Sequence, residues 1–144
     1  MVLINKNIHA NALFLKNKGI LILGPSGSGK SDLTLRLILK YNAVLIADDR
    51  TVLENKNGVL KAGCPQNIKG LLEVRGVGIC KFNTKTSAKI SLVVKLVSSN
   101  SKIERMPEPK TTEILGIKIP TIEIYAFEPS AAEKIIAAAC YQKI

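Results

Sequence analysis

The sequence predicts one α/β domain over residues 1–144, with a mixed central sheet, β-hairpins, flanking helices and a phosphate-binding loop (P-loop). Three observations support this prediction. Short apolar runs bounded by turn residues are typical of strands, two segments have helical periodicity, and the glycine-rich stretch Gly24–Ser31 lies between a strand-like run and a helix-like segment. A chain of 144 residues with 47% hydrophobic residues can bury one sizeable core.

The first elements lead directly into the glycine-rich stretch. Val2–Ile4 predicts a short strand. Ala12–Leu15 and Gly19–Leu23 predict a hairpin whose turn is Asn17–Gly19. The second arm of this hairpin ends where the P-loop begins.

A helix followed by a strand is predicted after the loop. In Ser31–Lys40, Leu33, Leu37 and Ile38 share one helical face, and two more leucines cover another. A helix that is apolar nearly all round is expected to be buried on a sheet. Ala43–Ala47 then reads as a buried strand.

The middle of the chain predicts strands separated by polar loops. The expected elements are a second hairpin (Thr51–Leu53 with Val59–Lys61), a structured loop with a short strand (Cys64–Gly78), a longer strand (Lys89–Val97) and a mobile loop (Ser98–Thr112).

The last two elements are a strand and a helix. Ile117–Ala126 alternates isoleucines with other residues around Pro120, which predicts a strand with an edge or a break there. Ser130 and Glu133 have the spacing of a capping box, and the alanines and isoleucines of Ala131–Ala139 form the apolar stripe of a helix.

Composition excludes several classes of protein. No apolar stretch approaches the roughly 18 residues of a membrane-spanning helix, and polar residues interrupt Met1–Lys6, so no secretory signal is predicted and a cytoplasmic location is expected. Cys64, Cys80 and Cys140 are widely spaced and share the chain with one histidine. They predict buried thiols rather than a zinc site or disulfides.

The net charge of +10 raises the question of an acidic partner. The lysines are scattered, and the chain has three tyrosines, three phenylalanines and no tryptophan, so no stacking platform interleaved with basic residues is visible. We interpret the lysines mainly as a solvated surface and do not expect nucleic acid as a partner. A bias toward lysine in the composition would give the same count.

The glycine-rich stretch fits the pattern G-x-x-x-x-G-K-[ST]. Its residues are Gly24, Pro25, Ser26, Gly27, Ser28, Gly29, Lys30 and Ser31. The glycines let backbone N–H groups point at a polyphosphate, and the following helix N-terminus adds partial positive charge. Lys30 can reach the β- and γ-phosphates, and Ser31 can ligate Mg²⁺. A purely structural glycine turn is the alternative, and the agreement of loop, lysine, serine and flanking elements argues against it.

An acidic pair and an alternating Glu/Arg pair add to this pattern. Asp48 and Asp49 stand where the Ala43–Ala47 strand ends, the edge at which ligands of open α/β sheets gather. They could hold Mg²⁺ or accept a proton from a hydroxyl. Glu73 and Arg75 would share one face of a strand and suit a metal ligand beside a phosphate clamp. A solvated strand end and a surface salt bridge are the respective alternatives.

Three segments together resemble the catalytic domain of bacterial HPr kinase/phosphorylase. These are Gly24–Ser31, Ile46–Arg50 and Leu71–Ile79, and the last matches the signature of that family. Further similarities lie in His9, which precedes Gly24 by 15 residues, in Glu104-Arg105 and in Glu113–Pro120. The resemblance extends over nearly the whole chain.

The resemblance implies a protein serine kinase that uses ATP and Mg²⁺. Its substrate would be HPr, the small phosphocarrier of the phosphotransferase system, and many members also catalyse phosphorolysis of the phosphoserine. ATP would lie on Gly24–Ser31, and Ser31 and Glu73 would hold Mg²⁺. Asp48 would be the base that accepts the serine proton, with Asp49 in support.

The remaining implied site residues carry positive charge or lie near the phosphates. Arg75 and Arg105 would neutralise phosphate charge, and His9 would lie near the phosphates. The family is typically hexameric, which the resemblance extends to this chain.

This chain departs from the family pattern at three places. An N-terminal domain that such enzymes often carry is not among the 144 residues, so we expect a short form without regulation through that domain. The Pro-Gly-Arg-Asn stretch expected before the last helix is replaced by Glu128–Ala131, and Pro25 replaces an acidic residue. Phosphorolysis and assembly therefore follow less directly from the resemblance than kinase chemistry does.

Two other functions remain compatible with the residues. One is a small-molecule kinase, against which the short distance from Lys30 to Asp48 argues. The other is a nucleotide-binding regulatory module without turnover, which the missing arginine stretch would suit. Transfer to metabolites, or ATP binding without transfer, would distinguish these alternatives.

Overall fold

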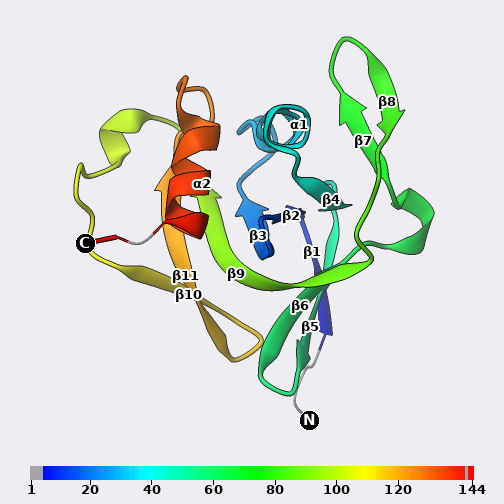
Figure 1. Ribbon diagram of the computed structural model, residues 1–144, viewed down its shortest axis with the longest axis horizontal. Coiled ribbons are helices and arrows are strands. Elements are labelled where there is room, and N and C mark those ends of the chain that lie inside the picture. The colour runs from blue at the N-terminus through cyan, green and yellow to red at the C-terminus, as the bar shows by residue number, and fades with distance from the viewer. Residues whose placement is uncertain (1–4, 142) are drawn as a thin grey trace.

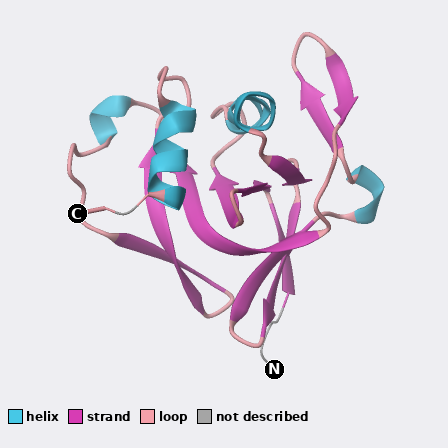
Figure 2. Ribbon diagram, in the orientation of Figure 1, coloured by secondary structure: helices cyan, strands magenta, loops and turns pink. Residues whose placement is uncertain are grey.

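The computed structural model describes residues 5–141 and 143–144, and within them it has a curled mixed sheet with two helices over one face (Figures 1 and 2). The strands of this main sheet are β1 (Asn5–Ile8), β2 (Ala10–Leu15), β3 (Lys18–Leu23), β4 (Val44–Ala47), β5 (Thr51–Lys56), β6 (Val59–Gly63), β9 (Ser87–Leu96), β10 (Lys110–Ile114) and β11 (Ile117–Ile124).

The other elements cover or extend from this sheet. They are the helices α1 (Lys30–Tyr41) and α2 (Ala131–Cys140), the short 3₁₀ helices η1 (Gln66–Ile68) and η2 (Asn100–Lys102), and the separate hairpin of β7 (Leu71–Val74) and β8 (Gly78–Lys81). In Figure 1 this hairpin extends away from the main sheet on the far side of α1 from α2. The predicted fold class, with its mixed sheet, hairpins and flanking helices, is confirmed.

The order of the strands gathers four carboxyl ends at one edge. The path through the sheet is β1-β5-β6-β9-β3-β2-β4, with β11 beside β9 and β10 beside β11. β3 and β11 are both parallel to β9, and β4 runs in the same direction because β2 is antiparallel to both β3 and β4. The segments that follow β3, β4, β9 and β11 therefore meet at the same edge of the sheet.

Both faces of the central strands are buried. Along β3, Ile20 and Ile22 pack into a cluster with α1 and α2, and Leu21 packs into a second cluster on the opposite face with residues of β5 and β6. Side chains alternate across a strand, so a continuous apolar run fills both clusters. The P-loop strand is consequently held on both sides.

The first hairpin forms as predicted, with its turn slightly displaced. β2 pairs with β3, and Lys16 and Asn17 make the turn with φ of 48° and 65°. Gly19 lies inside β3 instead, where a Cβ would stand 2.1 Å from the carbonyl oxygen of Lys89. Glycine is therefore required at position 19 by close packing on β9 and not by the turn. The strand predicted at Val2–Ile4 lies outside the described residues.

Helix α1 begins and ends close to its predicted bounds. Leu33 and Leu37 are fully buried, but Leu39 is 68% exposed. The helix is buried where it packs on the sheet, as expected, but not nearly all round, because only part of its surface is covered by the sheet and by α2 beside it (Figure 1). Neither helix in the described part of the chain combines the length and the apolar character that crossing a membrane requires.

The capping box predicted at α2 does not form. Ser130 is the N-cap residue, but its side chain makes no capping hydrogen bond; its hydroxyl donates to Glu128 Oε1 at 3.0 Å. The Glu133 carboxylate accepts a hydrogen bond from the Tyr41 hydroxyl of α1. Both side chains of the expected box thus have other partners, and Glu133 links the two helices.

The predicted middle elements are largely present. The β5–β6 hairpin forms, and the short strand expected in Cys64–Gly78 is β7. The mobile loop predicted at Ser98–Thr112 was too long, because its last residues belong to β10, an exposed edge strand paired with β11. Parallel pairing of β11 with β9 begins at Thr121, directly after Pro120, which has no N–H to donate.

Candidate active site

The P-loop connects β3 to α1 and is shaped by close packing. Gly29 has a φ of 98°, and a Cβ there would lie 2.7 Å from the Cβ of Ala126. A residue with a side chain would be strained by both the conformation and the contact. Glycine at this position therefore lets the loop pack against the segment that follows β11.

Lys30 lies inside the loop rather than in solvent. It is 6% exposed, and its Nζ donates to the carbonyl oxygens of Gly24 and Pro25. Burial lowers the pKa of Lys30, while the negative charges of Asp49 and Asp48 act in the opposite direction. A bound polyphosphate would supply the negative charge that this buried ammonium group lacks.

The loop also contains a polar atom without a partner. Ser28 Oγ is buried and makes no hydrogen bond within the described residues, whereas its backbone N–H donates to the Pro25 carbonyl at 3.1 Å. Buried polar groups are nearly always satisfied, and a phosphate oxygen could accept a hydrogen bond from this hydroxyl. The residues present fit a phosphate group at the N-terminus of α1.

The acidic pair lies directly beneath this loop. Asp48 Oδ1 accepts hydrogen bonds from Ser31 Oγ at 3.0 Å and from Asn11 Nδ2 at 2.9 Å. Burial raises the pKa of Asp48 above its usual value, although these hydrogen bonds oppose the rise. Asp48 is thus a carboxylate biased toward holding a proton.

Asn11 organises the acidic pair and was missed from the sequence. It is fully buried in β2; its Nδ2 donates to Asp48 and to Thr34 Oγ1, both at 2.9 Å, and its Oδ1 accepts from the Asp49 N–H at 2.8 Å. Asp49 has a left-handed φ of 67°, a conformation this hydrogen bond helps to hold. The signal available in the sequence was an asparagine inside an otherwise apolar strand.

The side chains of Asp49 and His9 are in direct contact. His9 follows β1, and its Nε2 lies 2.6 Å from Asp49 Oδ1. Both residues line a pocket of about 510 Å³, hereafter the P-loop pocket, together with P-loop and α1 residues. His9 therefore lies beside the P-loop, which agrees with the position that the family resemblance implied for it.

Glu73 and Arg75 complete one wall of the P-loop pocket. Both residues are exposed and line the pocket. Leu72, which precedes Glu73 in β7, is fully buried in the core. Glu73 and Arg75 do line the same pocket, but the predicted alternation is wrong beyond Glu73: β7 ends at Val74, Arg75 lies in the turn that follows, and Val74 lines the pocket as well. A carboxylate and a guanidinium consequently face the same cavity as Ser31 and Lys30.

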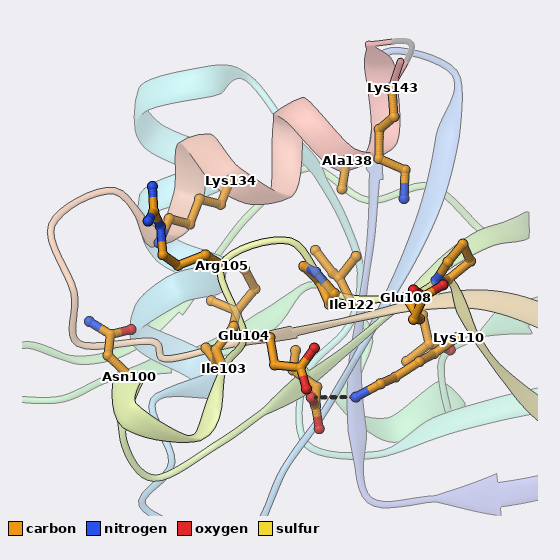
Figure 3. Close-up of a pocket in the computed structure, with 15 residues that line it drawn as sticks. Asn100, Ile103, Glu104, Arg105, Glu108, Lys110, Ile122, Lys134, Ala138 and Lys143 are labelled. Carbon is orange, nitrogen blue, oxygen red and sulfur yellow. Dashed lines mark hydrogen bonds and ion pairs between the residues drawn. The ribbon is translucent and has the colours of Figure 1, made fainter.

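Arg105 is not brought to this pocket. It lies between η2 and β10 and lines a second cavity of about 370 Å³, hereafter the α2 pocket (Figure 3). Other charged residues of this pocket are Glu104, Glu108, Lys110, Glu123, Lys134 and Lys143. Within a single chain, Arg105 is therefore separate from the other candidate site residues.

The oxygen ligands of the P-loop pocket suit Mg²⁺. The Ser31 hydroxyl and the Glu73 carboxylate face the pocket, and the Asp48 carboxylate lies next to Ser31. Within the described residues no group of three or more histidine, cysteine or acidic side chains converges. Mg²⁺ typically takes one or two protein carboxylates and completes its shell with phosphates and water, so the residues present fit it.

The fold and the site together define a class of protein. A P-loop after one strand, a buried carboxylate after a second strand of the same direction and a pocket between them are the features of a P-loop nucleotide-binding α/β domain.

Comparison with known proteins identifies the family. The family model described as HPr Serine kinase C-terminal domain matches residues 2–144, and the chain belongs to this family. The resemblance inferred from the sequence is thereby confirmed.

Curated relatives carry the same name. An HPr kinase/phosphorylase of Malacoplasma penetrans is 36% identical over 124 residues, covering 78% of this chain and 41% of the relative. One of Bordetella pertussis is 37% identical over 123 residues, covering 78% of this chain and 40% of the relative. The chain thus spans about two fifths of the length of these relatives.

A solved structure shares the fold. The Hpr(Ser) kinase/phosphatase from Coxiella burnetii superposes with a TM-score of 0.79 at 29% sequence identity, covering 90% of this chain and 91% of that chain.

Proposed function

We propose that this domain is an ATP-dependent, Mg²⁺-requiring protein serine kinase that phosphorylates an HPr-type phosphocarrier of the phosphotransferase system. The observation that carries the proposal is the placement of Asp48, a carboxylate with a raised pKa fixed directly beneath the P-loop by Ser31 and Asn11. The printed names of the relatives support the choice of acceptor.

Asp48 is the proposed general base. The acceptor serine oxygen attacks the γ-phosphorus, its proton passes to the Asp48 carboxylate, and the bond from the γ-phosphorus to the departing ADP oxygen breaks. A base is most effective when its pKa approaches the working pH, so a raised carboxyl pKa suits this role. For phosphorolysis we propose that an oxygen of inorganic phosphate attacks the phosphoserine phosphorus, the bond from that phosphorus to the serine oxygen breaks, and pyrophosphate forms. The protonated Asp48 would give its proton to the departing serine oxygen.

The neighbouring residues would hold the phosphates in position and neutralise their charge. The P-loop backbone and Lys30 would hold the phosphates, and Arg75 would face charge that develops on the transferred group. Mg²⁺, held by Ser31 and Glu73, would withdraw charge from the phosphate oxygens. Asp49 would support Asp48 from the adjacent position, and His9 would fix the Asp49 carboxylate through their 2.6 Å contact.

Arg105 requires a further step in this scheme. Because it lines the α2 pocket, it could neutralise phosphate only if its loop moved or if a neighbouring subunit supplied it. The proposal therefore includes an oligomer, a hexamer by family resemblance, and a cytoplasmic location in which the phosphocarrier would be met.

Transfer from labelled ATP to HPr-like proteins tests the proposal. The purified chain with Mg²⁺ should label a serine, and Asp48→Asn should abolish labelling while ATP binding persists, because its Oδ1 can still accept the bonds of Ser31 and Asn11. Glu113→Gln, on the exposed edge strand β10, is the control and should transfer normally.

Three outcomes would contradict the proposal. Normal transfer by Asp48→Asn would remove Asp48 as the base. A folded wild-type chain that binds ATP but labels no HPr-like protein would instead favour a nucleotide-binding regulatory module, an alternative suggested by Glu128–Ala131 replacing the arginine-containing stretch of the family. ADP release with a metabolite acceptor would favour a small-molecule kinase.

A further inference from the structure

An exposed aromatic ring borders the P-loop pocket. Phe127 is 57% exposed and lines the same cavity as Gly29 and Lys30. Among the described residues it packs into neither of the two buried apolar clusters. Its ring is therefore available to a ligand in the pocket rather than used by the core.

The backbone that carries this ring is held firmly. Ala126 is buried, and its carbonyl accepts a hydrogen bond from Arg36 Nη2 at 2.8 Å. The Phe127 ring meets the Tyr125 ring edge to face, with centroids 5.7 Å apart. A fixed aromatic surface loses little conformational freedom when a planar ligand stacks on it.

The ring lies directly against the P-loop. A Cβ built on Gly29 would be 3.3 Å from Phe127 Cζ. This proximity follows from the topology, since β11 and β3 flank β9 and all three run in the same direction. A nucleotide whose phosphates lie on the P-loop would consequently have its base within reach of this ring.

The rest of the pocket orients such a nucleotide. The charged residues that line the pocket are Lys30, Asp32, Asp49, Glu73 and Arg75, and His9 adds a polar ring. Such groups suit the phosphates and the acceptor rather than a nucleobase. The other apolar residues of the pocket, including Leu35, are half-buried and packed against the helix-side core. Phe127 remains as the exposed aromatic surface.

We propose that Phe127 is the platform on which the nucleobase of ATP stacks, with the phosphates leading from it across the P-loop toward Asp48. This inference rests on the proposed ATP-dependent function. Stacking on an aromatic ring is tolerant of base identity, because every base has a π-face, so we expect ATP and GTP to bind with similar affinity.

Binding of two ligands to the intact chain tests the platform. Calorimetric titration with ATP and with inorganic tripolyphosphate, each with Mg²⁺, separates the base from the phosphates. Phe127→Ala should weaken ATP binding about tenfold, the effect expected for loss of one stacked base, and should change tripolyphosphate binding less than about twofold. Phe127→Tyr should bind both ligands as the wild type does.

Tyr141→Ala is the matched control. Tyr141 is an aromatic residue with a similar exposure of 65%, but it follows α2 and does not line the P-loop pocket. It should leave both affinities unchanged. The comparison shows whether any loss in Phe127→Ala reflects the site rather than removal of an exposed ring in general.

The other outcomes show which of the two proposals fails. Equal weakening of ATP and tripolyphosphate in Phe127→Ala would mean that the ring only supports the loop through Gly29. No weakening of either would mean that the base lies elsewhere. A wild-type chain that binds neither ligand would overturn the proposed function as well, whereas ATP binding that depends on Phe127 without transfer to a protein would overturn the proposed function alone.

Discussion

The two pockets of this domain differ in how their charged groups are held. In the P-loop pocket, Asp48 is fixed by hydrogen bonds from buried Asn11 and from Ser31. The α2 pocket is lined by long, exposed side chains such as Arg105, with a surface ion pair of 2.9 Å between Lys110 and Glu123 (Figure 3). Dipoles and charges that are already fixed favour a reaction because they need not rearrange during it. An exposed ion pair in water is not fixed in this way.

The contrast has a structural origin. The P-loop pocket forms where β3, β4 and β11 end at one edge of the sheet, so its groups sit on short segments anchored by buried strands. The α2 pocket is closed on one side by the irregular segment between η2 and β10. Rigid strand ends, rather than the number of charges, distinguish the two sites.

The strongest test of this comparison is Asn11→Ala. The substitution leaves the Asp48 carboxylate and the Asp49 N–H without their buried partner, so we expect the free energy of unfolding to fall by about 2–3 kcal/mol. Displacement of the base should lower transfer about a hundredfold. Urea unfolding and single-turnover transfer measure the two effects.

Asn55→Ala is the matched control for that test. Asn55 also uses both ends of its amide, donating to the Leu115 carbonyl at 2.8 Å and accepting from the Gly58 N–H at 3.0 Å, but in the β5–β6 hairpin. It should lose stability while its folded fraction transfers normally. Equal loss of transfer in both variants would show that Asn11 acts only on stability.

A second, intermediate effect is the pH dependence produced by Asp48. Since burial raises the pKa of this carboxyl, the folded chain keeps a proton over a range of pH in which the unfolded chain releases it. The free energy of unfolding should therefore fall as the pH rises from the usual carboxyl value through the raised one. Transfer should increase over the same range, because the base must be ionised.

Asp48→Asn isolates this effect. The amide has no proton to lose, so the variant should gain stability relative to the wild type as the pH rises from acid to neutral. Urea unfolding at a series of pH values provides the measurement, with Glu113→Gln as the control. A stability difference that is constant with pH would contradict the raised pKa.

The smallest effect is expected at the α2 pocket. Arg105→Ala should change the affinity for ATP less than about twofold, because the residue lies outside the P-loop pocket and in an exposed setting. Titration with ATP in the absence of an acceptor checks this. A tenfold loss of affinity for ATP would show that Arg105 contributes to the nucleotide site, and would contradict the separation of the two pockets.

Local signals in the sequence predicted the fold well where a single segment carries the information. The P-loop, both early hairpins and α1 all depend on near neighbours. The alternation expected for Glu73 and Arg75 does not hold, because β7 ends at Val74 and the chain turns there. The capping box failed because Ser130 and Glu133 found distant or competing partners, Glu128 and Tyr41. The Tyr41–Glu133 hydrogen bond depends on how α1 and α2 pack. The spacing of residues within one helix carries no information on that packing.

Some active-site residues could likewise be predicted from the sequence, and others depend on tertiary packing. His9, Asp48, Asp49, Glu73 and Arg75 could be selected by residue type and by family resemblance, and the structure gathers them around the P-loop. The role of Asn11 could not be predicted, since it depends on β2 lying between β3 and β4. The separation of Arg105 likewise depends on the path of a loop rather than on a motif.

The β2–β3 hairpin also has a consequence for the order of folding. Asn11 lies opposite Ile22 in this hairpin, and the P-loop follows immediately, so the positioning amide and the phosphate cradle belong to one continuous stretch of chain. Contacts within such a stretch close short loops and cost little entropy. Asn11 and the P-loop can therefore come together early in folding. Asp48 joins them when β4, which it follows, pairs with β2 of this hairpin.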